Sequence, residues 1–424
     1  MAAIVKALMT KIVFCFPYRG VGGVSSVFAL VARELIERRE HEIYIADYRD
    51  GAMTKMLAAA DVRMIEYRDD APVALPSGAI VAFQSFPPWR WRYLSSLRFA
   101  TGTRIFFWNF HPFNLVPVLP GLRSLVMANE SFGVALGATL LRGYRQTLVR
   151  LVRFMLERNA LVFMDRPCHD TTERYLRMSI PDAQYLPLSA GHPGPTRCRP
   201  APDWSRGLRV AWVGRLADFK YPILRATLAR LDAIQPRLGV PVTFSVVGDG
   251  GYMDRLREFA RTLRRIDVRF VGSLAPDAVA EFLDAEADLV MAMGVSALEG
   301  ARLGIPTVLL DFSYRPVPEG YVYRWLHDQV GYSLGEPISP ARLVRGNDSL
   351  YRLISEAIDD FADVSTRAQD YFATAHSVRA VASRFLTLVE RSSCFYSDYE
   401  AAGFAVQDPI YKTFSLMRAR FASQ

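Results

Sequence analysis

The stretch VAWVGRLADFK, residues 210–220, starts as a short apolar run, reaches Gly214 and then carries Arg215 and Lys220. An apolar run bounded by a turn residue is typical of a buried strand. The two cations therefore lie where the strand opens into a loop, and we expect a helix to begin near Pro222. Because arginine and lysine there match the charge of a diphosphate without crossing a core, the stretch predicts an anion site at a strand end.

The rest of the second half continues this alternation of strands and helices. Helical patterns such as 253–264 and 276–285 separate its apolar runs. Alternation of this kind predicts an α/β fold with a parallel sheet. The apolar runs predicted as strands are 208–213, 242–247, 268–271, 289–292 and 307–310.

The first half shows the same alternation, with predicted strands at 12–16, 42–46, 79–83, 104–108 and 161–164. The proline-rich segment HPGPTRCRPAP, residues 192–202, then interrupts it, because proline continues neither a helix nor a sheet interior. We therefore predict domains at 1–191 and 208–375, a linker at 192–207 and a helical tail at 376–424. Ligands of open parallel sheets bind at the carboxyl ends of the strands, so we expect a cleft between the domains with one substrate on each side.

Length and composition fit this division and restrict the partners. The 424 residues suit two domains of about 200 residues each. A net charge of +8 favours an anionic partner, which includes phosphorylated substrates, nucleic acid and anionic membranes. Four scattered cysteines indicate a reducing compartment without structural zinc or disulfides. No apolar run reaches 18 residues and the amino-terminal segment does not resemble a signal peptide, so we expect a cytoplasmic protein.

A glycine-rich turn, GVGGVS at residues 20–25, follows the first predicted strand. Glycines there let a backbone approach a ligand, and the helix that follows favours negative charge at its start. A nicotinamide-binding turn would have a third glycine at Ser25 and an acid about 20 residues on. The candidate acid, Asp47, comes 27 residues after Gly20. A dehydrogenase and a plain tight turn both remain alternatives for this segment.

Three further turns follow strands of the second half. They are VVGDGG at 246–251, VGSL at 271–274 and the longer MGVSALEGARLGIP at 293–306. In the last of these, a small-residue loop precedes a short helix that carries Glu299. A carboxylate in the first turns of such a helix is placed to accept both hydroxyls of a ribose.

Together these motifs resemble the donor-binding half of GT-B glycosyltransferases, in particular the GT4-like family. The matching motifs lie across roughly residues 208–311. In chain order they are VGRL with Lys220, VGDG, FVG, AD, LEGA and GIP. In the first domain, Gly22 and Gly23 also match. The resemblance implies an α/β GT-B fold, with two Rossmann-like domains facing across a cleft and a C-terminal helical tail that returns to the first domain. It implies a nucleotide diphosphate sugar as donor (UDP, GDP or ADP), with neither a bound metal nor another cofactor.

The resemblance also assigns roles to individual residues. Arg215 and Lys220 would clamp the diphosphate, Glu299 would hold the ribose, and the Gly22-Gly23 backbone would face the phosphates. The remaining donor-binding positions that it implies are Gly214, Gly248, Asp249, Ser273, Leu274, Gly294, Val295 and Ser296.

One position departs from the family pattern. The family usually has a second glutamate eight residues before Glu299, near the donor sugar, and this chain has Met291 there. Gly294, Val295 and Ser296 could offer backbone amides and one hydroxyl to the sugar instead. A relative that binds the donor without turning it over therefore stays open as an alternative.

His111 lies in FWNFHP, residues 107–112, just beyond a predicted strand. Its position resembles the histidine that many family members place near the donor sugar. A histidine there can donate a hydrogen bond to the sugar or accept a proton near working pH. A histidine packed in an aromatic loop is the alternative.

Residues 140–158, from Leu140 to Arg158, have the pattern of a basic amphipathic helix. Leu140, Tyr144, Leu148, Leu151 and Met155 share one face, and arginines occupy the other. Such a helix can lie on an anionic membrane, and the segment PPWRWRY at 87–93 adds interfacial aromatics. A helix packed on its own sheet is the alternative. Nothing in the chain resembles a nucleic-acid module, so we expect no nucleic-acid partner.

The resemblance implies a retaining hexosyltransferase, and the basic, aromatic first domain suggests a glycan or lipid-linked acceptor in bacterial cell-surface polysaccharide synthesis. It would work in the cytoplasm or at the inner face of the cell membrane. The rivals are a GT-B-fold nucleotide-sugar epimerase, a non-catalytic nucleotide-sugar-binding partner and the dehydrogenase.

Overall fold

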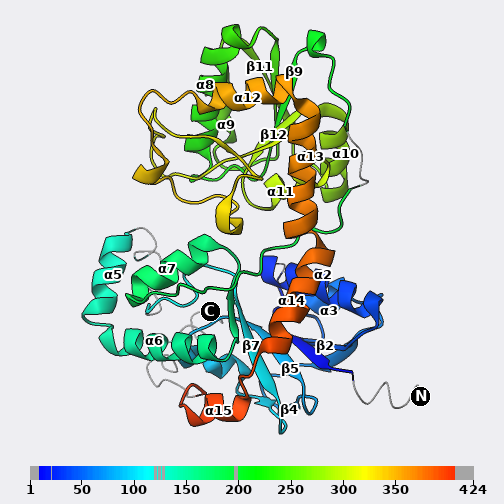
Figure 1. Cartoon of the computed structure of the whole chain (residues 1–424), viewed down its shortest axis with the longest axis vertical. Coiled ribbons are helices and arrows are strands. Elements are labelled where there is room, and N and C mark those ends of the chain that lie inside the picture. The colour runs from blue at the N-terminus through cyan, green and yellow to red at the C-terminus, as the bar shows by residue number, and fades with distance from the viewer. Residues whose placement is uncertain are drawn as a thin grey trace, which may run out of the picture. The chain divides into compact units, whose positions relative to one another are not determined.

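The computed structural model describes residues 9–20, 22–118, 122, 126, 129–194 and 199–405. Its backbone contacts divide the chain into two compact units (Figure 1). Unit 1 contains the residues up to Ser189 together with those from Val378 onwards, and unit 2 contains Ala190–Ser377.

Unit 1 is built on a six-stranded sheet in the order β3-β2-β1-β5-β7-β8, in which every neighbouring pair is parallel. The chain leaves β1 towards β2 and β3, then returns to the other side of β1 with β5. The sheet strands are β1 (Lys11–Cys15), β2 (Glu42–Asp47), β3 (Arg63–Glu66), β5 (Ile80–Gln84), β7 (Arg104–Asn109) and β8 (Leu161–Phe163). β4 (Val73–Ala74) and β6 (Leu97–Arg98) form a separate parallel pair.

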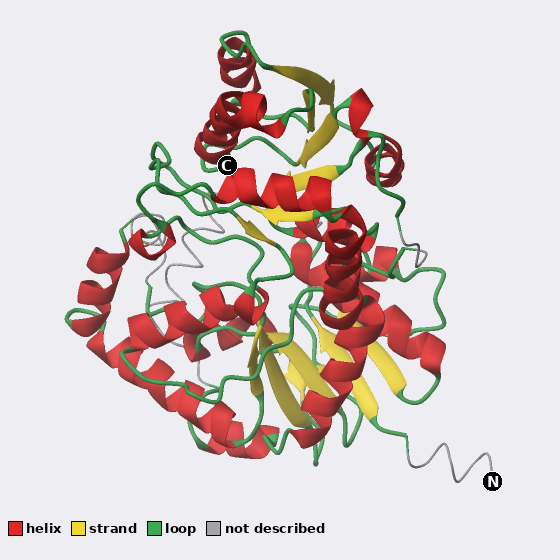
Figure 2. Ribbon diagram, turned by 45° about the horizontal axis from the view of Figure 1, so that its top comes forward, coloured by secondary structure: helices red, strands yellow, loops and turns green. Residues whose placement is uncertain are grey.

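Helices cover both faces of this sheet because successive residues of a strand point to opposite sides. On one face, Phe14 of β1 stacks 5.1 Å from Phe385 of α14 and lies 5.2 Å from Phe28 of α2. On the other face, Phe107 of β7 lies 6.0 Å from Tyr399 of α15. Figure 2 shows helices packed around the strands. The helices of unit 1 are α2 (Gly23–Arg38), α3 (Ala52–Met56), α5 (Glu130–Ala138), α6 (Arg142–Glu157), α7 (Arg166–Leu176), α14 (Val378–Arg391) and α15 (Tyr396–Ala401), with a 3-10 helix, η1, at Pro88–Leu94.

The C-terminal helices are integral to unit 1. α14 lies beside α2 (Figure 1), where Arg38 donates to the hydroxyl of Ser383 and to the carbonyl of Arg379, both at 2.9 Å. Beyond α14, the amide of Ile105 donates to the carbonyl of Cys394 at 2.9 Å. The tail therefore supplies backbone and side-chain partners that the earlier part of the unit needs.

Unit 2 repeats the plan with the order β11-β10-β9-β12-β13-β14, parallel except for the antiparallel β13–β14 pair. Its strands are β9 (Leu208–Val213), β10 (Val242–Val247), β11 (Ile266–Gly272), β12 (Leu289–Ala292), β13 (Thr307–Leu309) and β14 (Arg324–Trp325). Its helices are α8 (Tyr221–Leu238), α9 (Met253–Ala260), α10 (Pro276–Glu286), α11 (Val295–Arg302), α12 (Ser349–Asp359) and α13 (Phe361–Tyr371), followed by η5 (Phe372–His376). The short 3-10 helices are η2 (Trp204–Arg206), η3 (Val330–Tyr332) and η4 (Pro340–Arg342).

The strands that sequence patterning predicted are present, with shifts at their ends. β9, β10 and β12 match their predicted ranges, whereas β11 begins two residues before residue 268 and β13 ends at Leu309. β3 escaped the prediction because its residues are mostly exposed and have no apolar run. The predicted linker at 192–207 lies within unit 2, where the amide of Gly194 donates to the carbonyl of Arg302. No helix within the described ranges combines the length and apolar character needed to span a bilayer.

Candidate functional site

The carboxyl edge of the unit 2 sheet gathers most of the predicted site residues. β9 lies between β10 and β12, so the strand order reverses there, and open α/β sheets bind ligands beside such a point. Gly214 follows β9 and Gly294 follows β12. The two turns flank the position at which a ligand of this fold class binds.

The turns after β9 and β10 pack backbone against backbone at this edge. A Cβ on Gly248 would lie 2.0 Å from the carbonyl oxygen of Gly214, and one on Gly250 would lie 2.3 Å from that of Leu216. Both glycines have positive φ, at 127° and 152°. The amide of Gly214 donates to the carbonyl of Val247 at 3.0 Å. These glycines are therefore required by the contact between the turns, whatever ligand binds there.

Arg215 and Lys220 both leave the turn after β9. A Cβ on Gly214 would lie 3.2 Å from Nζ of Lys220, so the ammonium lies over the end of the strand. Lys220 is half-buried and Arg215 is exposed. Burial, followed by the nearby positive charge of Arg215, lowers the pKa of Lys220.

Neither cation forms an ion pair with a carboxylate among the residues that the structure describes. Asp218, in the same turn, uses Oδ1 to accept from the amide of Phe219 at 2.9 Å. Two like charges held together at the edge of a core repel each other and have lost part of their hydration. An anion between them would remove both penalties.

The turn between β12 and α11 offers fewer amides than expected. The amide of Gly294 donates to the carbonyl of Leu334 at 2.6 Å, so it is not available to a ligand. Val295 and Ser296 open α11, where the first amides of a helix have no partner within the helix. Two of the three predicted amides, those of Val295 and Ser296, are therefore available to a ligand. They carry the partial positive charge of the helix start.

Glu299 lies in the second turn of α11 and is held by Arg302, a residue that the sequence reasoning missed. Nε and Nη2 of Arg302 both donate to Oε2 of Glu299, at 2.9 and 2.8 Å. Among the described residues nothing donates to Oε1. The carboxylate is thus oriented with one oxygen open to a hydroxyl. A spacing of three residues on a helix is typical of such pairs and could have predicted it.

Met291 is not a simple replacement of a glutamate. It lies inside β12, paired with Val308, and its side chain is fully buried. That side chain belongs to the cluster under α8 and α12, on the face of the sheet opposite to α11. Just two residues, Met293 and Gly294, separate β12 from α11. Where the family pattern has a second glutamate, this chain therefore has a core methionine, and the two-residue turn that follows carries no acid.

The nucleoside-side residues lie at the same edge. Ser273 and Leu274 follow β11, with Ser273 exposed and Leu274 half-buried. Asp249 is exposed, and its Oδ1 accepts from the amide of Gly250 at 2.7 Å, which stabilises its own turn. No group of histidine, cysteine or acidic side chains suited to a metal ion occurs among the described residues.

In unit 1, Gly22 and Gly23 lie at the start of α2. Gly22 precedes the helix in an extended conformation, and a Cβ on Gly23 would meet nothing within 4 Å. The hydroxyl of Ser25 donates back to the carbonyl of Gly22 at 2.8 Å. The start of α2 is therefore held by its serines and leaves open space at Gly23. Val21 lies outside the described residues.

Asp47 is part of the protein's own framework. Its buried carboxylate accepts from the amides of Tyr18 and Tyr48 on one oxygen and of Met53 and Thr54 on the other, at 2.8–3.3 Å. Burial raises its pKa, and the four amide bonds oppose that shift. The dehydrogenase alternative required Asp47 to accept ribose hydroxyls. Both of its carboxylate oxygens instead accept backbone amides.

His111 follows β7 at the carboxyl edge of the unit 1 sheet. Its Nδ1 accepts from the amide of Phe113 at 3.0 Å, and its ring is half-buried 5.8 Å from that of Phe113. In the neutral ring the proton therefore belongs on Nε2. The aromatic loop and a donor role are compatible, because the loop fixes the tautomer that donates.

The predicted amphipathic helix is α6, and its apolar face is packed on the sheet. Leu148, Leu151 and Met155 are almost completely buried in the unit 1 core. Tyr144 lies 4.8 Å from Trp89, and Leu140, which is 85% exposed, lies before the helix begins. The alternative of a helix packed on its own sheet is confirmed, and these apolar side chains are covered by the unit 1 core. The side chains of residues 91–93 lie outside the described set.

Comparison with known proteins shows the fold. No protein-family model matches the sequence, and no curated protein is similar to it in sequence. The lipopolysaccharide outer core galactosyltransferase WaaB is similar in structure, with a TM-score of 0.53 and 13% identity over 90% of this chain and 99% of that one. A glycosyltransferase from Rickettsia africae ESF-5 has a TM-score of 0.51 and 11% identity, over 90% and 98% of the two chains.

A third solved structure, Anabaena Alr3699/HepE in complex with UDP, has a TM-score of 0.51 and 13% identity, over 90% of this chain and all of that one. These neighbours are GT-B glycosyltransferases. At such low identity the similarity shows the fold, which is the GT-B fold with two Rossmann-like units of the α/β class. That confirms the fold class predicted from the sequence.

Proposed function

We propose that this protein is a glycosyltransferase that moves a sugar from a nucleotide diphosphate sugar to a glycan or lipid-linked acceptor. The observation that carries the proposal is the pair Arg215 and Lys220, which lies unneutralised at the strand end where this fold class binds its ligand. A diphosphate is the natural counter-ion for two cations so placed.

Bond cleavage would build negative charge on the departing nucleotide diphosphate. Arg215, Lys220 and the amides of Val295 and Ser296 are fixed positive groups that would stabilise this charge more in the transition state than in the ground state. Partial burial of Lys220 strengthens its interaction with an anion, because less water screens it.

The nucleoside would lie towards β10 and β11. Oε1 of Glu299 would accept a ribose hydroxyl while Arg302 keeps the carboxylate oriented. The turns at Gly248–Asp249 and Ser273–Leu274 would border the base. In unit 1 we propose that His111 donates Nε2–H to the donor sugar and that the backbone at Gly22 and Gly23 contacts the phosphates.

The finer features of the function follow from the resemblance of the donor motifs. We propose a GT4-like transferase that retains the anomeric configuration and serves bacterial surface polysaccharide synthesis in the cytoplasm, with any contact to the membrane being peripheral. The free, buried thiols of Cys15, Cys168 and Cys394 fit a reducing compartment.

A second candidate is a protein that binds a nucleotide sugar without transferring it. The two-residue turn before α11 favours this candidate, because it holds no second acid for the sugar. Incubation of the full chain with the donor that it binds and with glycolipid acceptors separates the two. Appearance of free nucleotide diphosphate and a glycosylated product supports transfer, whereas binding without either product supports the second candidate. Product formed from the donor alone, as an epimerised nucleotide sugar, would indicate the epimerase.

A thermal-shift panel of UDP, GDP and ADP tests the site. We expect one of them to stabilise the protein, and we expect Arg215→Ala and Lys220→Ala each to weaken its binding about tenfold or more. Arg261→Ala is the matched control, because this exposed arginine follows α9, just before β11 begins, at the amino edge of the same sheet. Binding unchanged in both site variants would remove the proposal.

A further inference from the structure

The loop after β13 presents an aromatic ring at the carboxyl edge of the unit 2 sheet. Tyr314 is 70% exposed, more than any other large aromatic side chain that the structure describes. A single exposed tyrosine would need no explanation by itself. Here the surrounding contacts fix the loop that carries it.

On its inner side the loop is attached to the turn that carries Lys220. The amide of Ser313 donates to the carbonyl of Phe219 at 3.1 Å. The ring of Phe219 lies 5.6 Å from Phe312 and 6.0 Å from Tyr314. The hydroxyl of Ser313 accepts from the amide of Arg315 at 3.0 Å and donates to the carbonyl of the same residue at 2.8 Å, which closes a tight turn around Tyr314.

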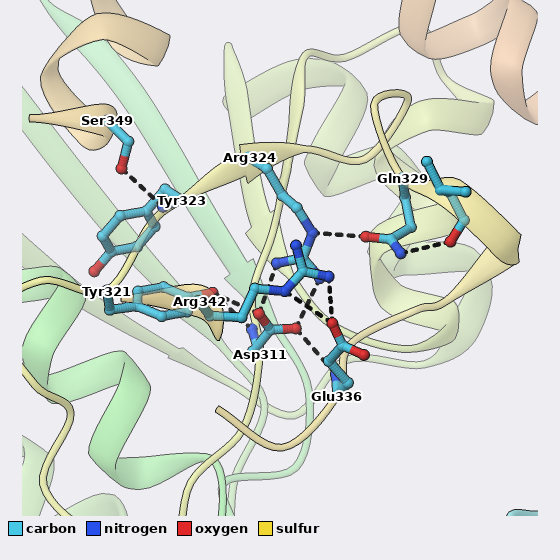
Figure 3. A network of polar contacts seen from close by, with 9 residues as sticks. Asp311, Tyr321, Tyr323, Arg324, Gln329, Glu336, Arg342 and Ser349 are labelled. Carbon is cyan, nitrogen blue, oxygen red and sulfur yellow. Dashed lines mark hydrogen bonds and ion pairs between the residues drawn. The ribbon is translucent and has the colours of Figure 1, made fainter. Parts of the chain in front are cut away.

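On its other side the loop begins at a buried charged network (Figure 3). Asp311 directly precedes Phe312 and is fully buried. Its two oxygens accept from Nη1 and Nη2 of Arg324 at 2.6 and 2.8 Å. The hydroxyl of Tyr321 accepts from the amide of Asp311 at 3.0 Å, and the amide of Glu336 donates to Oδ1 at 3.0 Å. A bidentate pair of this kind fixes direction as well as distance.

The position of Tyr314 follows from these contacts. Nζ of Lys220 lies 5.9 Å from the ring centroid of Phe219, which also contacts Tyr314. The loop follows β13, which lies on the β12 side of β9, whereas the turns after β10 and β11 lie on the other side. With the base towards β10 and β11 and the ribose at Glu299, a diphosphate at Lys220 would leave its sugar on the β12–β13 side of β9, where Tyr314 lies.

We infer that Tyr314 is a specificity-determining platform for the sugar of the donor, an inference that rests on the proposed function. The ring presents an apolar surface to one C–H face of a pyranose and leaves the sugar hydroxyls to polar partners. Phe219, Ser313 and the Asp311–Arg324 pair hold that ring in place before the ligand arrives. The contact would compensate for the acid that the short β12–α11 turn does not provide.

Matched ligand pairs test this inference. Calorimetry on the full chain would compare UDP with UDP-glucose, GDP with GDP-mannose and ADP with ADP-glucose, and the pair that the unmodified protein binds is carried forward. For Tyr314→Ala we expect unchanged affinity for the diphosphate and a loss of about three- to tenfold for the nucleotide sugar. Tyr314→Phe should keep both affinities, because the proposed contact uses the ring and not the hydroxyl.

The control is Tyr351→Ala. Tyr351 belongs to α12 and stacks 3.9 Å under Arg237 in the last turn of α8, at the amino edge of the same sheet. It should change neither affinity. If Tyr314→Ala weakens the diphosphate and the nucleotide sugar equally, or weakens neither, the platform is overturned while the proposed function stands. If the unmodified protein binds none of the six ligands, the proposed function fails and the inference fails with it.

Discussion

Each unit has a turn that leads from the first strand of its sheet into the first helix, at the strand where the order reverses. In unit 1 the buried carboxylate of Asp47, at the end of β2, accepts the amide of Tyr18 in the turn after β1 and three amides of the segment that leads from β2 into α3. In unit 2 the turn after β9 is held by glycines of the neighbouring turn, and its cations Arg215 and Lys220 have no carboxylate partner among the described residues. The first turn uses its buried charge internally, whereas the second leaves its charge for a ligand.

The two turns differ in what stabilises their backbone. Asp47 stabilises the unit 1 turn by hydrogen bonding, which consumes the acid that a ribose would need. Unit 2 obtains the same rigidity from close backbone contact at Gly248 and Gly250, which requires no charged group. Arg215 and Lys220 can therefore stay without partners while their turn remains ordered.

The largest effect is expected from removing the backbone contact in unit 2. Gly248→Ala would place a Cβ 2.0 Å from the Gly214 carbonyl at a φ of 127°. We expect a loss of at least about 3 kcal/mol of unfolding free energy, because both the clash and the strained backbone must be relieved. Thermal denaturation measures it. Gly251→Ala is the control, since its Cβ would meet nothing within 4 Å; equal stability of the two variants would contradict the packing argument.

Asp47→Ala should destabilise unit 1 by about 2–4 kcal/mol, because four backbone amides, one buried and three partly buried, lose their acceptor. Chemical denaturation measures the loss, and Asp61→Ala, at an exposed position, should stay within about 0.5 kcal/mol of the parent. Binding of the nucleotide diphosphate should persist below the melting temperature. A stable Asp47→Ala variant that has lost nicotinamide binding would instead support the dehydrogenase.

The two turns also differ in how pH should affect them. The pKa of Lys220 is lowered by burial and by Arg215, so its ammonium loses its proton below the usual lysine range. Once the terminal phosphate of the ligand is fully ionised, diphosphate affinity should be constant up to that lowered pKa and should weaken up to about tenfold per pH unit above it. Lys220→Arg should flatten this alkaline fall, since a guanidinium stays charged. An identical alkaline profile in the variant would show that Lys220 does not contact the ligand.

A smaller effect than those on the two turns is expected at the ribose. Glu299→Gln keeps the shape of the side chain but removes the charge that Arg302 orients, and we expect about tenfold weaker binding of the nucleotide diphosphate. Calorimetry with the corresponding 2′-deoxynucleotide should show a smaller loss, because one hydroxyl is already missing. An equal loss for both nucleotides would place Glu299 away from the ribose.

The sequence predicted the features that have a periodic or local sequence pattern. Apolar runs located β9, β10 and β12, and the turn motifs located the cations at one strand end. β3 left no such trace, because its residues are mostly exposed. Asp47 was a candidate ligand in the sequence, and its four amide partners depend on how the turn and α3 pack around it. The role of Met291 depended on where β12 ends, which an eight-residue spacing cannot show.

The paired cations are tested most directly by Lys220→Met, which keeps much of the side-chain volume and removes the charge. The account predicts that the ligand-free variant melts at a higher temperature than the parent, because a half-buried ammonium beside Arg215 has been removed. It also predicts that, at the same concentration, the nucleotide diphosphate raises the melting temperature of the variant much less than that of the parent. A variant that melts lower than the parent and is still stabilised by the diphosphate to the same extent would contradict the account.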